Sequence, residues 1–290
     1  MADGRPIAVT ASARDQTIRV WNVADGQPVG QPLVGAAANI TKLATTFVEG
    51  DLHALTAVLR TGVQIWDLTT GRCVATRPLR YGDEVGALAT AEVGGRALAV
   101  VGRRSPAQVW NVAAGGNDGP LLKHPLVYAA SITTVGDRPV AVTGGHDLTV
   151  RVWDPATGEP IGPPRRGHTG WVSAMATAVV DGTTVAVTGS YGFEGSLRTW
   201  DLSEPRLPGR IVSGHTGWVG SVATTVVDGR PVAATANVGE SEVRIWDLRE
   251  ARRDGPVLAF ANDVTALAAA PGGFLVVCSG RDVSVLASDR

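Results

Sequence analysis

Hydrophobic and polar residues alternate in short runs along this chain, a pattern typical of half-buried β-strands rather than of helices. The stretch from Gly167 to Asp201 shows the pattern most clearly. It contains three runs rich in Val, Thr and Ala, and the first two are joined by Asp181-Gly182, a dipeptide that readily takes the positive φ angles of a tight hairpin. A fourth run follows Asp201, so the pattern predicts a four-stranded meander.

The same meander recurs along the whole chain. Each of six copies has Trp followed by Asp or Asn at the end of its third run. The six pairs are separated by 45, 44, 43, 47 and 46 residues and stand at Trp21-Asn22, Trp66-Asp67, Trp110-Asn111, Trp153-Asp154, Trp200-Asp201 and Trp246-Asp247. A period of this length, built from four short strands, predicts the blades of a radial propeller rather than a sandwich.

Counting runs predicts an all-β fold with seven blades, of which blades 1 and 7 are incomplete. Residues 1–34 supply three strands of blade 1, the last of them over Gln27–Leu33. Residues 38–260 supply blades 2 to 6, and residues 263–290 supply three strands of blade 7. We expect a single propeller domain over residues 1–290, and we infer that the two missing strands lie upstream of Met1. The alternative is a six-bladed ring in which Val264–Ala270 completes blade 1.

These features resemble the WD40 repeat family, with the regularity of its bacterial members. Gly167-His168 and Gly214-His215 match the opening Gly-His of that repeat, and the six Trp pairs match its closing dipeptide. The resemblance implies a non-catalytic platform for binding a protein or peptide. In bacterial relatives such a propeller is often joined to an effector domain, so we expect the sensor or docking part of a larger signalling protein, with an upstream effector domain as one candidate partner.

The resemblance also implies a buried network in each blade that links the opening His, a Ser or Thr, an acid and the closing Trp. Blade 4 has all four members, whereas Glu194 and Glu240 stand at the acid positions of blades 5 and 6. The network residues are His124, Thr143, Asp147 and Trp153 in blade 4, His168, Thr188 and Trp200 in blade 5, and His215, Thr235 and Trp246 in blade 6.

A His with an acid and a hydroxyl residue could also form a hydrolase triad, but triad chemistry needs the hydroxyl exposed beside an oxyanion hole. Here the constellation repeats with the fold and ends on a large aromatic residue, as a structural brace would. No second His or Cys stands at a metal-ligand spacing, and no nucleotide-binding fingerprint is present. We therefore expect no catalytic residue, no metal and no cofactor.

Composition limits the classes of partner that the protein can be expected to bind. A formal net charge of −1 and a pI near 6.5 argue against nucleic acid, which attracts basic proteins. The sequence shows no export signal and no apolar run approaching the roughly 20 residues that span a bilayer, so no membrane partner is expected. Cys73 and Cys278 are read as reduced thiols in a cytoplasmic protein.

The loops that form the upper face of a WD40 propeller contain aromatic residues in blades 5 and 6. Trp171 and Trp218 occupy equivalent positions, and a longer loop in blade 5 adds Tyr191 and Phe193. Trp and Tyr are frequent interface anchors, so we expect a partner to dock here. The alternative is that both indoles merely pack on the blade below them.

The charged residues expected on the same rim are unevenly distributed among the blades. Arg103, Arg104 and His146 fall in blades 3 and 4, whereas Glu240 and Glu242 fall in blade 6. A polarised rim could orient the partner, although ordinary solvated loop charges would look the same. Two further functions stay open: a purely structural scaffold in a multi-subunit assembly, and a propeller enzyme with an active site in its channel. The small residues expected along the innermost strands argue against the enzyme.

Overall fold

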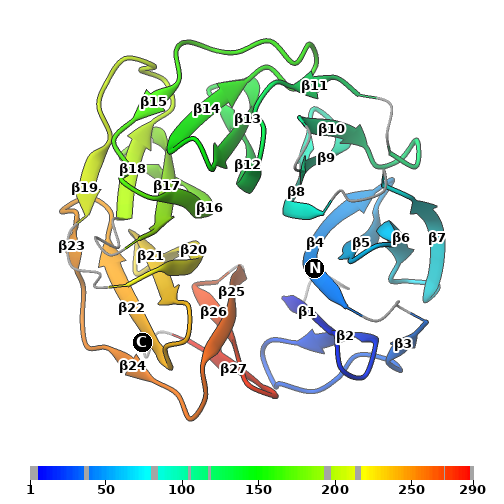
Figure 1. Cartoon of the computed structure of the whole chain (residues 1–290). Coiled ribbons are helices and arrows are strands. Elements are labelled where there is room, and N and C mark those ends of the chain that lie inside the picture. The colour runs from blue at the N-terminus through cyan, green and yellow to red at the C-terminus, as the bar shows by residue number, and fades with distance from the viewer. Residues whose placement is uncertain are drawn as a thin grey trace. The chain divides into compact units, whose positions relative to one another are not determined.

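The chain folds into β-strands joined by tight turns. The structure is a computed structural model that describes residues 6–35, 39–79, 84–103, 106–116, 119–192, 197–212, 217–270 and 272–287. Within these ranges there are 27 strands and no helix, and the strands form seven antiparallel sheets. The predicted all-β fold with seven blades is therefore confirmed (Figure 1).

Contacts divide the chain into two compact units. The first comprises Met1–Thr143 and Val152–Ile161, and the second comprises Gly144–Arg151 and Gly162–Arg290. Three sheets lie entirely within the first unit. Their strands are β1 (Ile7–Ser12), β2 (Thr17–Asn22) and β3 (Leu33–Val34); β4 (Ile40–Val48), β5 (Asp51–Val58), β6 (Gly62–Asp67) and β7 (Arg72–Arg77); and β8 (Val85–Val93), β9 (Arg96–Arg103), β10 (Ala107–Asn111) and β11 (Leu121–Leu122).

The fourth sheet has residues in both units and runs in the order β12-β13-β14-β15. Its strands are β12 (Val127–Val135), β13 (Arg138–Gly145), β14 (Thr149–Trp153) and β15 (Arg165–Arg166).

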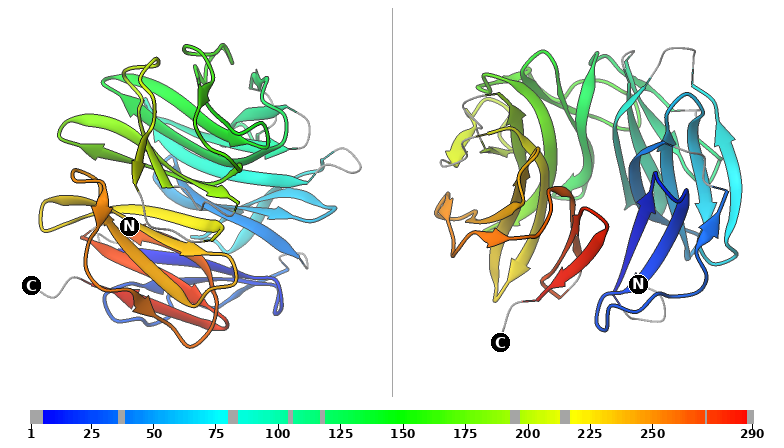
Figure 2. Two further views of the ribbon diagram at one scale, coloured as in Figure 1. Left: turned by 60° about the vertical axis from the view of Figure 1, so that its left-hand side comes forward. Right: turned by 60° about the horizontal axis from the view of Figure 1, so that its bottom comes forward.

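Three further sheets lie in the second unit, and the strands of each sheet lie side by side (Figure 2). They comprise β16 (Trp171–Val180), β17 (Thr183–Tyr191), β18 (Leu197–Asp201) and β19 (Arg210–Val212); β20 (Val219–Val227), β21 (Arg230–Asn237), β22 (Glu242–Asp247), β23 (Arg252–Arg253) and β24 (Leu258–Ala259); and β25 (Val264–Ala270), β26 (Phe274–Ser279) and β27 (Asp282–Leu286).

Strand pairing follows the turn residues. Asp181 and Gly182 both have positive φ, 48° and 81°, and Asp228 and Gly229 repeat this geometry at 50° and 72°. Two successive positive φ angles make the turn whose twist matches a β-hairpin, and Asp-Gly tolerates them with little strain. The hairpin predicted from Asp181-Gly182 is therefore confirmed.

The first and last sheets have three strands each among the described residues, as predicted. One boundary differs from expectation. The last strand of the first sheet was expected over Gln27–Leu33, but it is confined to Leu33–Val34 after an isolated bridge between Trp21 and Pro28. Pro28 and Pro32 have no N–H to donate to a ladder, which explains why pairing is interrupted there.

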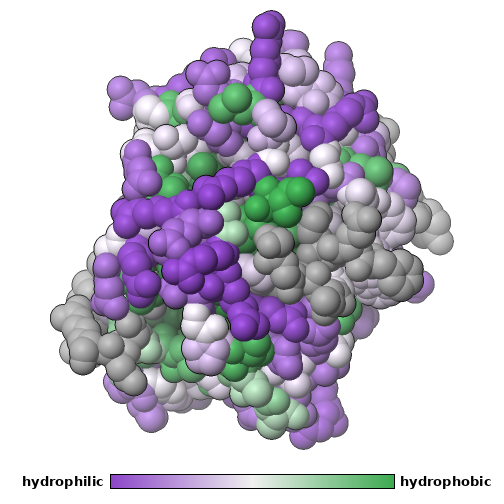
Figure 3. Space-filling model, turned by 90° about the vertical axis from the view of Figure 1, so that its left-hand side faces the viewer, coloured by the Kyte–Doolittle hydropathy of each residue, from purple (hydrophilic) through white to green (hydrophobic). Residues whose placement is uncertain are grey.

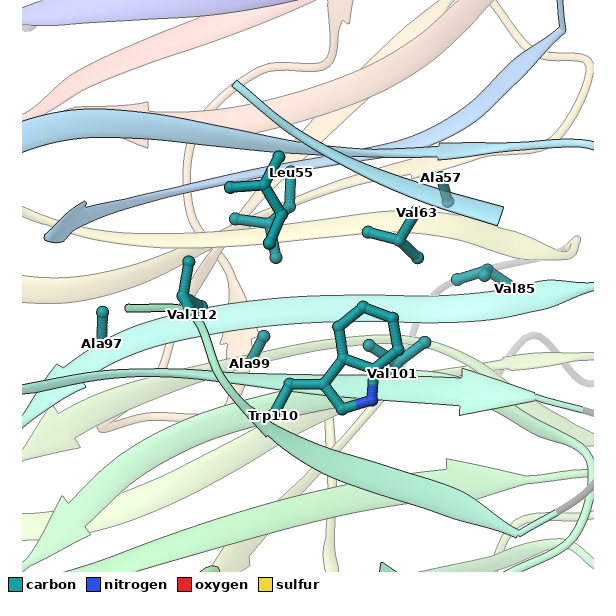
Figure 4. Close-up of a cluster of buried hydrophobic side chains, with 10 residues drawn as sticks. Leu55, Ala57, Val63, Val85, Ala97, Ala99, Val101, Trp110 and Val112 are labelled. Carbon is teal, nitrogen blue, oxygen red and sulfur yellow. The ribbon is translucent and has the colours of Figure 1, made fainter. Parts of the chain in front are cut away.

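Apolar side chains fill the space between neighbouring sheets within each unit. In the first unit, Leu55, Val63 and Ile65 of the second sheet meet Ala99 and Trp110 of the third (Figure 4). All five are nearly or completely buried. Burial of apolar area contributes about 25 cal/mol per Å², so these seams between sheets supply much of the driving force for folding.

Candidate functional site

Four aromatic side chains form one continuous stack, which we call the aromatic ladder. All four residues lie in the second unit, and they come from the fourth, fifth and sixth sheets. His146 contacts Trp171 with ring centroids 4.3 Å apart, Trp171 stacks on Tyr191 at 5.4 Å, and Tyr191 stacks on Trp218 at 4.0 Å. The planes of Trp171 and Tyr191 are inclined by only 9°. The structure thus brings together Trp171, Tyr191 and Trp218, and it adds His146, which the sequence had placed on a separate basic rim.

Strand register produces the ladder. Trp171 opens β16 and is paired with Tyr191, the last residue of β17, so that both rings project from the same end of one hairpin. His146 follows the end of β13, and Trp218 precedes β20 by one residue. A Cβ added at Gly170 would lie 1.9 Å from the Tyr191 carbonyl oxygen, so only glycine fits at that position.

The ladder is open to solvent. His146 and Trp171 are exposed, with Trp171 retaining 39% of its accessible area, and Tyr191 and Trp218 are half-buried. Both predicted indoles therefore remain accessible while they are held by ring contacts. The side chains of a rigid aromatic surface of this kind lose little conformational entropy when a ligand or partner binds to it.

Acidic groups border the Trp218 end. A Cβ at Gly217 would lie 3.1 Å from Glu240 Oε1 and 2.9 Å from the side-chain nitrogen of Asn237. Arg244 donates to Glu240 at 3.4 Å and to Glu242 at 2.9 Å. Asn237, which the sequence did not single out, is 1% exposed, and within the described part of the chain neither polar atom of its side chain has a hydrogen-bond partner.

The remaining residues predicted for this face are not part of the described ladder. Arg103 lies in the first unit, at the end of β9, where its Nη2 donates to Gln108 Oε1 at 3.2 Å. Phe193 and Arg104 lie outside the described residues, as does His215 of the predicted network.

The buried networks centre on threonine hydroxyls. In the fourth sheet, Trp153 Nε1 donates to Thr143 Oγ1 at 2.8 Å, and His124 Nδ1 lies 2.7 Å from the same oxygen. The fifth sheet repeats this arrangement. There, Trp200 Nε1 and His168 Nε2 each lie 2.7 Å from Thr188 Oγ1.

Asp147, the predicted fourth member, faces its own turn. Its Oδ1 accepts from the backbone N–H of Thr149 at 3.1 Å and from the Thr149 hydroxyl at 2.7 Å. Its Oδ2 accepts from Arg151 at 2.6 Å. These contacts fix the turn between β13 and β14, which is the turn that presents His146.

The Trp-to-Thr bond also occurs in three other sheets. Trp246 donates to Thr235 at 2.8 Å; in the first two sheets, for which the sequence indicated no histidine, Trp21 donates to Thr10 at 2.8 Å and Trp66 to Thr56 at 3.2 Å. In the third sheet Val101 lies opposite Gln108, and Trp110 donates to Gln108 at 3.2 Å instead. The bonds of the first two sheets were not predicted, because the histidine was taken as the mark of the network. A threonine 10 or 11 residues before the tryptophan was the available signal in these two sheets.

Burial governs the ionisation of His168. The ring is 5% exposed, and removal from water lowers its pKa from 6.5 to about 3, with the positive charge of Arg198 acting in the same direction. The imidazole is therefore neutral at physiological pH. Thr143, Thr188 and Thr235 are completely buried, which places the hydroxyls out of reach of a substrate.

In the described ranges, no group of three or more His, Cys, Asp or Glu side chains could hold a metal ion. The same ranges contain no helix that is both long and apolar enough to cross a membrane.

Comparison with known proteins supports the fold. Residues 123–154 match the family model described as "WD domain, G-beta repeat". A solved structure titled "Structure of U3-55K" aligns with 96% of this chain and 90% of that chain, at 20% identity and a TM-score of 0.72. That identity shows a shared fold alone. No curated protein matches the sequence.

Proposed function

We propose that this chain, a seven-bladed β-propeller whose fourth blade carries a WD40 repeat, is a non-catalytic docking platform for a protein or peptide partner. WD40 propellers generally mediate protein–protein interaction. The observation that carries the proposal is the aromatic ladder, because its four rings from three sheets form one accessible surface.

The ladder has the properties of an interface anchor. Trp and Tyr dominate the binding energy of many interfaces because each offers a large, rigid apolar face together with a polar edge. The stack fixes these faces before a partner arrives, which lowers the entropy cost of binding. The carboxylate of Glu240, which lies close to Gly217 beside Trp218, and the Arg244 that pairs with it supply the polar rim that such anchors usually have.

The cellular setting is also a proposal. The resemblance to bacterial WD40 proteins supports a role as the sensor or docking part of a cytoplasmic signalling protein, with an effector domain either in the same polypeptide or in a separate one. The buried network hydroxyls support a non-catalytic role, since a triad needs its nucleophile exposed.

The test is binding of a selected peptide. Peptides are chosen against the parent protein from a randomised displayed library, and their affinities are measured by calorimetry. We expect Trp171→Ala and Trp218→Ala each to weaken binding at least 10-fold, or about 1.4 kcal/mol, because each removes one anchor ring. The melting temperature should stay close to that of the parent.

Val179→Ala is the matched control, because Val179 lies on the same strand as Trp171 and is 60% exposed. It should leave the affinity unchanged. Peptides that bind the Trp171→Ala/Trp218→Ala double variant as tightly as the parent would place the docking surface elsewhere.

A further inference from the structure

A groove of about 420 Å³ lies beside the outer strand β15 in the second unit, and no ladder residue lines it. Segments 163–166 and 205–208 form its walls together with the Trp200 ring. Figure 3 shows hydrophilic and hydrophobic side chains intermixed on the flank of the molecule that carries β15, β19 and β23.

The walls of the groove are stiff. Each segment contributes two prolines, Pro163 and Pro164 on one side and Pro205 and Pro208 on the other, and a proline ring fixes the backbone φ angle. Gly162 has φ of 79°, and a Cβ there would lie 2.5 Å from Pro205, so the segments approach closely. The groove therefore exists before any ligand enters it.

Arg165 lines this groove and is 4% exposed. Its Nη1 donates to the backbone carbonyl of Asp201, whereas Nε and Nη2 are buried and have no hydrogen-bond partner among the residues that the structure describes. A guanidinium stays charged in proteins, so two buried donors without acceptors carry a substantial desolvation cost. This site therefore has unmet capacity for an acceptor.

The two unpaired donors of Arg165, Nε and Nη2, are oriented in parallel. The N–H bonds of Nε and Nη2 point to the same side of the planar guanidinium, and this pair binds both oxygens of one carboxylate or phosphate group. The third donor atom is already fixed by Asp201, which holds the plane in one orientation. Arg165 is thus arranged to receive a two-oxygen acceptor.

The charge and polarity of the groove define the class of ligand. Arg165, Arg166 and Arg206 line it, and none of the described residues that line it is Asp or Glu. The carboxylate of Asp201 acts electrostatically on Arg165, and its Oδ1 already accepts from the backbone N–H and the hydroxyl of Ser203 at 2.8 and 2.5 Å. The prolines, Leu207 and the Trp200 ring make the remaining wall apolar.

We propose that this groove binds an organic anion, in which a carboxylate or phosphate group engages Arg165 and a small apolar body lies against Trp200 and the prolines. Such a group occurs both in free organic acids and at the C-terminus of a peptide, and the two sources share the same chemistry. The site is separate from the aromatic ladder, and it stands whether or not the docking proposal holds.

The experiment uses three probes on the whole chain: phenylacetate, N-acetyl-alanyl-phenylalanine and the C-terminal amide of that dipeptide. Binding is followed by calorimetry and by the indole N–H signal of Trp200, assigned through Trp200→Phe. We expect the two acids to bind and to shift this signal, and the amide to bind at least 10-fold more weakly. The stronger of the two acids identifies the source.

Arg165→Lys keeps the charge but removes the planar pair of donors, so affinity for the preferred acid should fall at least 10-fold. Arg253→Gln is the control, because Arg253 is an exposed arginine on the outer strand β23 that does not line the groove. If neither acid binds the parent at 10 mM, or if binding leaves the Trp200 signal unmoved, the proposal is overturned. The parent measurement decides this even if Arg165→Lys fails to fold.

Discussion

The threonine hydroxyls of the buried networks serve as shared acceptors. Thr143 and Thr188 are completely buried, and each accepts from a tryptophan and contacts a histidine nitrogen. A buried indole N–H without an acceptor would cost about 1–3 kcal/mol, so the position is constrained by hydrogen bonding as well as by volume. Where valine replaces the threonine, as at Val101, a nearby glutamine side chain accepts instead.

Thr143→Val should therefore destabilise the protein by about 1–3 kcal/mol, because it preserves shape but leaves Trp153 Nε1 and His124 Nδ1 without their shared partner. Trp153→Ala should cost more, about 3–5 kcal/mol, since a large buried ring is lost. Urea denaturation measures both. The exposed Thr69 provides Thr69→Val as a control with no expected change, and parent-like stability of Thr143→Val would contradict the prediction.

A second prediction at this scale concerns pH. Because the folded pKa of His168 is about 3 and the unfolded value is 6.5, the unfolded chain binds one more proton between these limits. Stability contributed by the neutral ring is complete above pH 6.5 and falls as pH decreases, by up to about 1.4 kcal/mol per pH unit.

Urea denaturation between pH 7.5 and 4.5 tests this slope and avoids the range where Asp67 and Asp154, whose pKa values are lowered, become protonated. We expect His168→Gln to reduce the dependence of stability on pH in that interval. Equal slopes for parent and variant would show that His168 ionises alike in both states.

At the scale of elements, neighbouring sheets approach closely where glycine faces a branched residue. A Cβ at Gly189 on β17 would lie 2.3 Å from Val219 Cγ1 on β20, and Gly144 faces Val172 at the same distance. Both contacts lie in the second unit and repeat from sheet to sheet. The spacing between these sheets is therefore set by backbone contact with a valine side chain.

Gly189→Ala should cost about 1–3 kcal/mol through overpacking, and adding Val219→Ala should recover part of that loss because it removes the clashing methyl groups. A double-mutant cycle in urea gives the coupling energy. Gly192→Ala is the control, since its nearest contact would be an ordinary 3.6 Å. Strict additivity of the two substitutions would mean that the clash is relieved by backbone movement.

At the scale of the whole molecule, the first sheet lacks, among the described residues, the inner partner strand that the four-stranded sheets have. β1 pairs with the Trp21 strand β2 alone, whereas its equivalent β17 pairs with both the Trp200 strand β18 and the inner strand β16. An edge strand offers unpaired N–H and carbonyl groups to another extended segment.

A synthetic peptide copying residues 167–180 should therefore raise the melting temperature of the chain when it is added in excess. A peptide of the same composition in scrambled order is the control. If both peptides leave the melting temperature unchanged, the β1 edge is not available for strand addition.

The sequence repeat explains which parts of the fold could be predicted from the sequence. The Trp pairs and the Asp-Gly hairpins are local signals that recur with one period, so seven sheets could be placed from the sequence. The side-chain partners depend on register across sheets: nothing local indicates that His146 stacks on Trp171, or that Arg165 has two unpaired donors. The sequence also predicted too long a last strand for the first sheet. Prolines interrupt the pairing there, so β3 is only two residues long.

The eight tryptophans fall into two classes according to the surroundings of the indole ring, and these surroundings affect fluorescence. Six donate Nε1 to a fixed side-chain acceptor, at Trp21, Trp66, Trp110, Trp153, Trp200 and Trp246, whereas Trp171 and Trp218 stand on either side of Tyr191. Five of the six are almost fully screened from solvent, so a soluble collisional quencher reaches mainly the ladder pair and the half-buried Trp21, which lies outside the ladder. Loss of quenching would then report docking on the ladder directly, without any label attached to the protein.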